Sequence, residues 1–145
     1  MVADGPANEL MKARLLRSDA GRGFILDGYP ATDGQAEALD QFLSEHSFPA
    51  PIVVVIDAPE EVLRDRMTRR GRADDEPSNI ERRLRDYREV GRLVEQRYGP
   101  ARTVRVDGAS TPADVAARIA KGVEELQLRE GLKTRKPEEG GLKTR

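Results

Sequence analysis

Residues 23–35 read G-F-I-L-D-G-Y-P-A-T-D-G-Q, and this stretch decides the fold that we expect. A short apolar run at 24–26 leads to Asp27 and to a turn that Pro30 stiffens, because its ring fixes φ. A helical pattern begins at Asp33. The order of strand, acidic loop and helix is typical of open parallel sheets, in which ligands bind beyond the carboxyl ends of the strands. Asp27 is therefore a candidate site residue.

The same residues also fit a purely structural role. Gly28 can take a positive φ in a turn, where glycine costs little. Thr32 and Gln35 match a capping box, in which the glutamine side chain returns to the backbone amide of Thr32. Spacing alone favours these structural roles over a functional one.

The rest of the chain alternates helix and strand. A continuous β-branched run at 52–56 is typical of a strand buried on both faces of a parallel sheet. A further short strand is expected at 103–106, and Asp57 is a candidate cap for the helix that follows the first of these strands. Helices are predicted over about residues 6–18, 33–46, 57–70, 78–98 and 111–128. This order indicates an α/β fold with a three-layer parallel sheet and helices on both of its faces.

Composition narrows the class of protein. The chain has 145 residues, 37% of them hydrophobic, and a net charge of −1, which fits one globular domain over residues 1–128. Residues 129–145 are charged and contain G-L-K-T-R twice, so we expect a disordered tail. The absence of cysteine excludes disulfides and thiolate metal sites. No long apolar run or leader is visible, so we expect a cytoplasmic protein without a membrane partner.

Arginines are concentrated between residues 64 and 105. A guanidinium pairs bidentately with phosphate oxygens, whereas solvated helix faces also accommodate many arginines. Two motifs stand out, R-R-G-R-A-D-D at 69–75 and R-R-L-R-D-Y at 82–87. Asp74 and Asp75 either hold the neighbouring guanidiniums or are simple acids at the start of a helix, and spacing favours the second role.

These motifs resemble those of the adenylate kinase family of nucleoside monophosphate kinases. The family signature is D-G-[YF]-P-R with glutamine or asparagine four residues past the arginine. Its matches here are Asp27, Gly28, Tyr29, Pro30 and Gln35. Ala31 stands where the family has arginine. The patterns R-x-G-R-x-D-D and x-x-R-L-x-x-Y are met at 69–75 and 82–87, and the resemblance, over about residues 2–126, is to the short-lid type with a lid near 70–76.

The resemblance implies transfer of a phosphoryl group from ATP to AMP, giving two ADP, with Mg²⁺ as cofactor. Asp27 is implied in catalysis through water on the magnesium ion, since hard oxygen ligands suit this ion. Gln35 is implied to read the adenine edge of AMP. Gly28, Tyr29 and Pro30 are implied to line the AMP site.

The resemblance also assigns roles to the second half of the chain. Arg70 is implied to hold ATP phosphates, and Arg72 and Arg83 to hold the AMP phosphate and the transferred phosphoryl group. Arg66 and the backbone of Gly108 are implied to contact the ATP adenine. Such a cluster suits phosphoryl transfer, because positioning and charge neutralisation supply most of the catalysis.

One family feature does not occur in the sequence. The phosphate loop G-x-x-x-x-G-K-[ST], which cradles ATP phosphates on backbone amides, is absent from these 145 residues. The N-terminal strand that carries it in the family normally lies between the strands matched here at 24–26 and 52–56. We therefore expect a P-loop kinase-like fold without this strand and loop.

Three hypotheses follow. The chain is the C-terminal part of an adenylate kinase, truncated or completed by a second chain that supplies the strand. Alternatively, it is a family remnant that binds nucleotides or another protein without catalysis. In the third hypothesis its arginines, on the face formed by 82–92, bind a nucleic acid backbone. Interleaved acids, a 4% aromatic content and the net charge of −1 argue against the third, so we expect no nucleic acid partner.

Overall fold

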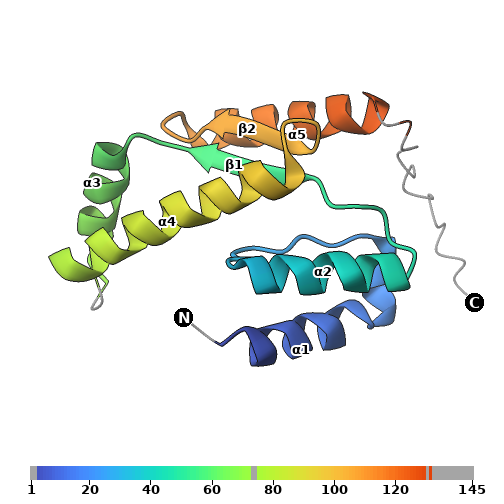
Figure 1. Ribbon diagram of the computed structural model, residues 1–145. Coiled ribbons are helices and arrows are strands. Elements are labelled where there is room, and N and C mark those ends of the chain that lie inside the picture. Colours follow the sequence, from blue (N-terminus) through green and yellow to red (C-terminus); the bar gives the residue numbers. More distant parts are fainter. Residues whose placement is uncertain (1–2, 73–74, 130, 132–145) are drawn as a thin grey trace, which may run out of the picture.

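The computed structural model describes residues 3–72, 75–129 and 131 (Figure 1). Helices predominate in this part of the chain, and the strands form one small parallel sheet. The elements are α1 (Asp4–Leu15), the short 3-10 helix η1 (Ser18–Arg22), α2 (Asp33–Glu45), β1 (Val53–Asp57), α3 (Glu60–Arg70), α4 (Pro77–Tyr98), β2 (Thr103–Asp107) and α5 (Pro112–Arg129).

Strands β1 and β2 pair in parallel, with Val53 opposite Thr103 and Asp57 opposite Asp107. Both strands therefore end at the same edge of the sheet, each on an aspartate. Helix α5 packs on one face through an apolar cluster, and α4 crosses the strands on the other face (Figure 1). The cluster contains Val104, Val106 and Leu126, with Ile52, Val115, Ile119 and Val123 packed against it.

A second apolar cluster lies between α1 and α2. Its buried members are Met11, Leu15, Ala20, Leu39, Phe42 and Leu43, and Leu26, Tyr29 and Phe48 pack against them. An ion pair of 2.7 Å between Arg97 Nε and Asp40 Oδ2 links the end of α4 to α2. The loop that follows residue 26 is thus supported by a different cluster from the one that supports the sheet.

The prediction of a strand at 24–26 is wrong. Residues 23–26 form no strand and pair with none in the described part of the chain, and Ile25 is 96% exposed. A strand needs a neighbour for its backbone N–H and C=O groups, and no described strand lies beside this segment. The expectation that β1 is buried on both faces is also wrong, because Ile56 is 47% exposed.

Helix ends follow the local sequence. Gly71 ends α3 in the left-handed region with φ of 61°, where glycine is favoured. Thr32 caps α2, since its side-chain oxygen accepts from the backbone N–H of Gln35 at 3.2 Å.

The predicted domain boundary at 128 stays a prediction. Apart from residues 129 and 131, the predicted tail lies outside the described residues, as does Asp74 within the predicted lid at 70–76.

None of the helices in the described part of the chain combines the length and the apolar character that crossing a membrane requires. The most apolar faces instead pack inward, on the α1–α2 cluster and on the sheet.

Candidate functional site

Two of the predicted phosphate-binding side chains, those of Arg70 and Arg83, meet the backbone of Arg72 at one carboxylate, that of Asp75. Its Oδ1 accepts from Arg70 Nη2 at 2.7 Å and from Arg83 Nη1 at 2.6 Å. Its Oδ2 accepts from Arg70 Nε and from the backbone N–H of Arg72, both at 3.1 Å. The Asp75 side chain is only 2% exposed, against 37% for Arg70 and 30% for Arg83. Helices α3 and α4 and the turn between them are thus joined at this point.

The charge of Asp75 is fixed by these contacts. The hydrogen bond from Arg70 holds the pKa of this carboxyl well below its usual range, and the backbone of Arg72 and the side chain of Arg83 lower it further, while burial opposes them. The carboxylate is therefore ionised across the physiological range. The role of Asp75 as a simple helix-start acid, which spacing favoured, is wrong, because α4 begins only at Pro77. The signal was its place in R-x-G-R-x-D-D, directly after the arginines that it binds.

The two residues assigned to the ATP adenine are in contact. Arg66 Nη1 donates to the backbone oxygen of Gly108 at 2.7 Å, and Gly108 N–H donates to the Asp57 backbone oxygen at 2.6 Å. A Cβ added at Gly108 would lie 2.6 Å from Ile56 Cγ2. Only glycine therefore lets the loop after β2 lie this close to the end of β1.

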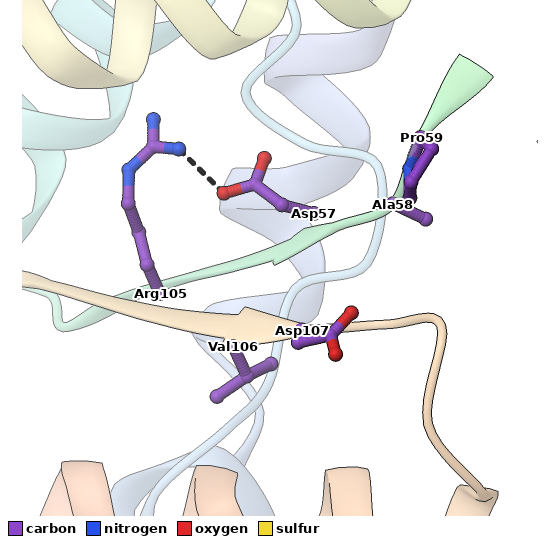
Figure 2. Close-up of a pocket in the computed structure, with 6 residues that line it drawn as sticks. All are labelled: Asp57, Ala58, Pro59, Arg105, Val106 and Asp107. Atoms are coloured by element: carbon purple, nitrogen blue, oxygen red, sulfur yellow. Dashed lines mark hydrogen bonds and ion pairs between the residues drawn. The ribbon is translucent and has the colours of Figure 1, made fainter.

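A pocket of about 320 Å³ opens at the carboxyl ends of β1 and β2 (Figure 2). Its lining residues are Asp57, Ala58, Pro59, Arg105, Val106 and Asp107. Asp57 accepts from Arg105 Nη1 at 2.5 Å and from the Tyr87 hydroxyl at 2.8 Å. The prediction that Asp57 caps α3 is wrong, because Pro59 occupies the cap position and Asp57 binds these side chains instead.

Burial raises the pKa of Tyr87 to about 12, and its hydrogen bond to Asp57 adds to this effect. The Tyr87 hydroxyl is therefore a permanent donor at neutral pH. Arg105 also forms an ion pair with Glu95 of α4. This network ties the middle of α4 to the pocket edge, and sequence reasoning missed it because its partners lie 30 and 48 residues from Asp57.

The predicted AMP residues lie around the start of α2. Gln35 is 4% exposed, its Oε1 accepts from the Ala31 backbone N–H at 2.8 Å, and its Nε2 donates to Asp4 Oδ1 at 3.0 Å. The capping-box prediction is therefore half right, since the glutamine returns to residue 31 and not to Thr32. The Tyr29 hydroxyl donates to Asn8 Oδ1 at 2.8 Å and to the Gln35 backbone oxygen at 3.2 Å.

Asp27 and Gly28 form the exposed tip of this loop, with φ of 70° at Gly28, and Pro30 follows them. Within the described residues, no hydrogen bond or ion pair joins Asp27 to the arginine cluster around Asp75. The N-terminal ends of α2 and α4 do face the same side of the molecule in Figure 1. The predicted site residues thus form two groups, the arginines around Asp75 and the residues around Gln35. No hydrogen bond or ion pair between described residues has been found to join Asp27 to the first group.

The residues present fit a magnesium ion held through water. The Asp27 carboxylate is exposed and has no side-chain partner in the described part of the chain. Magnesium usually keeps several waters and takes one or two carboxylates together with substrate phosphates. The described residues contain no group of three or more acidic or histidine side chains that could ligate a metal directly. A single exposed carboxylate such as Asp27 is compatible with this way of holding the ion.

These features define an α/β protein with a pocket at the ends of parallel strands and a separate arginine cluster suited to phosphate groups. The adenylate kinase family model matches residues 1–101. The chain belongs to the adenylate kinase family, as the motifs had indicated. It is similar to proteins named adenylate kinase from several bacteria.

The identity to the Micrococcus luteus protein is 39% over 127 residues, which covers 84% of this chain and 62% of that protein. The identity to the Bifidobacterium longum protein is 36% over 129 residues, covering 86% of this chain and 69% of that one. The Stenotrophomonas maltophilia protein is 36% identical over 128 residues, with coverage of 85% and 68%. The chain therefore spans only about two thirds of the length of these relatives.

Proposed function

We propose that this chain forms part of an adenylate kinase that transfers a phosphoryl group from ATP to AMP, giving two ADP. The observation that carries the proposal is the convergence of the Arg70 and Arg83 guanidiniums and the Arg72 backbone N–H on the Asp75 carboxylate. Donors that converge on one carboxylate are also placed to converge on phosphate oxygens, which have the same charge and similar acceptor geometry. Family membership supports the same conclusion.

In this proposal the arginines supply most of the catalysis. Arg70, at the end of α3, holds ATP phosphates, and Arg83, in α4, neutralises the phosphoryl group as it moves to AMP. Arg72 holds the AMP phosphate from the turn between these helices. Phosphoryl transfer requires alignment and charge stabilisation and little covalent chemistry from the protein. Asp75 keeps Arg70 and Arg83 side by side, so that the cluster is preorganised.

The adenines of ATP and AMP are assigned to two different groups of residues. Arg66 and Gly108, which are in contact, hold the adenine of ATP beside the strand-end pocket. The loop at Gly28, Tyr29 and Pro30 lines the AMP site, where Gln35 reads the base. Mg²⁺, when bound with ATP, neutralises part of the polyphosphate charge, and Asp27 orients a water on that ion.

We further propose that the complete fold has three layers and that its sheet includes a strand with a phosphate loop, which lies either in a longer form of this chain or in a second chain. The free edge of β1 supports this, because β1 pairs with β2 alone in the described residues. The exposed apolar side chains of Val54 and Ile56 on this strand support it as well, since an edge strand with exposed apolar side chains is a template for pairing. The cytoplasmic location and the absence of nucleic acid and membrane partners remain predictions.

A non-catalytic nucleotide-binding or protein-binding role is the alternative. It is favoured by Ala31, which has no guanidinium to hold the AMP phosphate where the family has one. The loss of one preorganised charged donor costs roughly 10²- to 10³-fold in rate. The alternative keeps the same nucleotide contacts and differs only in turnover.

A coupled assay of ADP formation with ATP, AMP and Mg²⁺ tests the proposal. The test variant is Arg83→Ala, and the control is Arg82→Ala, which removes an exposed arginine from the adjacent position of α4. We expect roughly a 10²- to 10³-fold loss of turnover for the first and little change for the second. Equal turnover in both variants would refute the assignment of Arg83. Nucleotide binding without turnover by the unaltered chain would support the alternative.

A further inference from the structure

The amide of Gln35 is held in one orientation by two groups of opposite character. Asp4 Oδ1 is an acceptor, and the Ala31 backbone N–H is a donor. An ionised carboxylate can only accept and a backbone N–H can only donate, so the amide cannot turn over without losing both hydrogen bonds. Gln35 is 4% exposed, so water cannot readily replace the lost partners.

Asp4 is itself held firmly, at the first residue of α1. The Thr32 hydroxyl donates to Asp4 Oδ2 at 2.9 Å, so both oxygens of this carboxylate are occupied. A Cβ added at Gly34 would lie 2.8 Å from the same Oδ2, which means that glycine at this position admits the carboxylate. The start of α1 is thus fastened to the start of α2 at the residue that fixes Gln35.

A glutamine amide has two N–H groups and two acceptor positions on its oxygen. Asp4 and residue 31 use one of each, which leaves one donor and one acceptor in fixed places. A 6-aminopurine presents a donor at its amino group and an acceptor at N1, whereas a 6-oxopurine presents the reverse. An amide free to turn over could pair with either base, and a fixed amide pairs with only one of them.

We propose that Asp4 is a specificity-determining residue, which selects a 6-aminopurine over a 6-oxopurine by fixing the orientation of the Gln35 amide. This inference rests on the proposed function, in which Gln35 reads the AMP base. One bidentate base contact discriminates by roughly 5- to 150-fold. We therefore expect the unaltered chain to bind AMP more tightly than inosine monophosphate by a factor in this range.

The test measures the dissociation constants of AMP and inosine monophosphate by calorimetry. These two probes differ only at position 6 and at the N1 proton. Asp4→Asn is isosteric and offers Gln35 either an acceptor or a donor, so turning the amide over then costs only the hydrogen bond from the Ala31 backbone N–H and not both hydrogen bonds. We expect the ratio of the two constants to narrow by roughly 3- to 10-fold, the worth of one hydrogen bond. Gly34→Ala, which displaces the Asp4 carboxylate, should narrow the ratio in the same direction.

Glu9→Gln is the matched control, because Glu9 is an exposed acid on the same helix that pairs only with Lys12 in the described chain. It should leave the ratio unchanged. A second readout is the NMR signal of the Gln35 side-chain amide, whose carboxylate-bonded proton should shift in Asp4→Asn and not in Glu9→Gln.

The outcomes separate this inference from the function on which it rests. If AMP binds and the ratio in Asp4→Asn equals that of the unaltered chain, the role of Asp4 is refuted and the proposed function stands. If the unaltered chain binds neither nucleotide, base reading by Gln35 is refuted, and with it the specificity role. In that case the NMR signal still shows whether Asp4 holds the amide.

Discussion

The packing of α5 against the sheet can be tested by changing one glycine to alanine in α5 and, for comparison, one glycine to alanine in α4. A Cβ added at Gly122 in α5 would lie 2.4 Å from Cγ1 of Val104, a β2 side chain that is 7% exposed. A Cβ added at Gly91 in α4 would meet nothing within 4 Å. Both glycines lie in helix interiors, where alanine is favoured over glycine by about 1 kcal/mol.

The two substitutions should therefore change stability in opposite directions. Gly91→Ala gains only the helix propensity of alanine over glycine and should raise the free energy of unfolding by about 0.5–1 kcal/mol. Gly122→Ala gains the same propensity and loses about 1–3 kcal/mol of stability to overpacking against Val104. The propensity gain is common to both variants, so the difference between their free energies of unfolding, about 1–3 kcal/mol, measures the contact between α5 and β2.

Equilibrium unfolding in urea measures both variants, and an unchanged m value shows that the midpoints can be compared. If the two midpoints rise by the same amount, α5 does not sit on Val104 as described. This result would also affect the candidate site, since α5 holds the strand whose end carries Asp107 and Gly108.

Two further predictions concern ionisation. The pKa of Asp75 is lowered by Arg70, so the stability that this carboxylate contributes should be fully present above its ordinary pKa of about 4 and lost only in stronger acid. The difference in urea midpoint between the unaltered chain and Asp75→Asn should then be constant above that pH and shrink below it, with Asp65→Asn as an exposed control. For Tyr87, burial raises the pKa to about 12, so its contribution is complete below about pH 10 and is lost as pH rises toward 12. The stability difference between the unaltered chain and Tyr87→Phe should narrow over that range, and a difference independent of pH would contradict the assigned hydrogen bond.

Local patterns predicted most of the secondary structure. The β-branched run at 52–56 gave β1 within one residue, and the apolar spacing of 78–98 gave α4 within one residue of its start. The cap at Thr32 and the stop at Gly71 were also correct, because the interactions that form them span at most a few residues. These features depend on neighbours in the sequence, which the sequence displays directly.

The sequence could not predict the partners of polar side chains that are distant along the chain. Asp57 follows the β-branched run and comes two residues before a proline, which is the pattern of a helix cap, yet it binds Tyr87 and Arg105. Nothing in the pattern distinguishes a carboxylate that caps its own helix from one that pairs with the helix packed across the sheet. Asp75 shows the reverse case, since its arginine partners lie within eight residues and the motif contained the signal.

The added strand proposed above would account both for the unpaired segment at 24–26 and for the separation of the two groups of site residues. Adjacent strands lie about 4.8 Å apart, so a strand placed between 24–26 and β1 would hold their ends about 10 Å apart. Asp27 and Asp57 would then lie at the same edge of one sheet, with the end of the added strand between them. That edge already contains the strand-end pocket. Completion of the sheet would thus give the backbone of 24–26 a hydrogen-bonding neighbour and bring the acidic loop to the pocket in a single step.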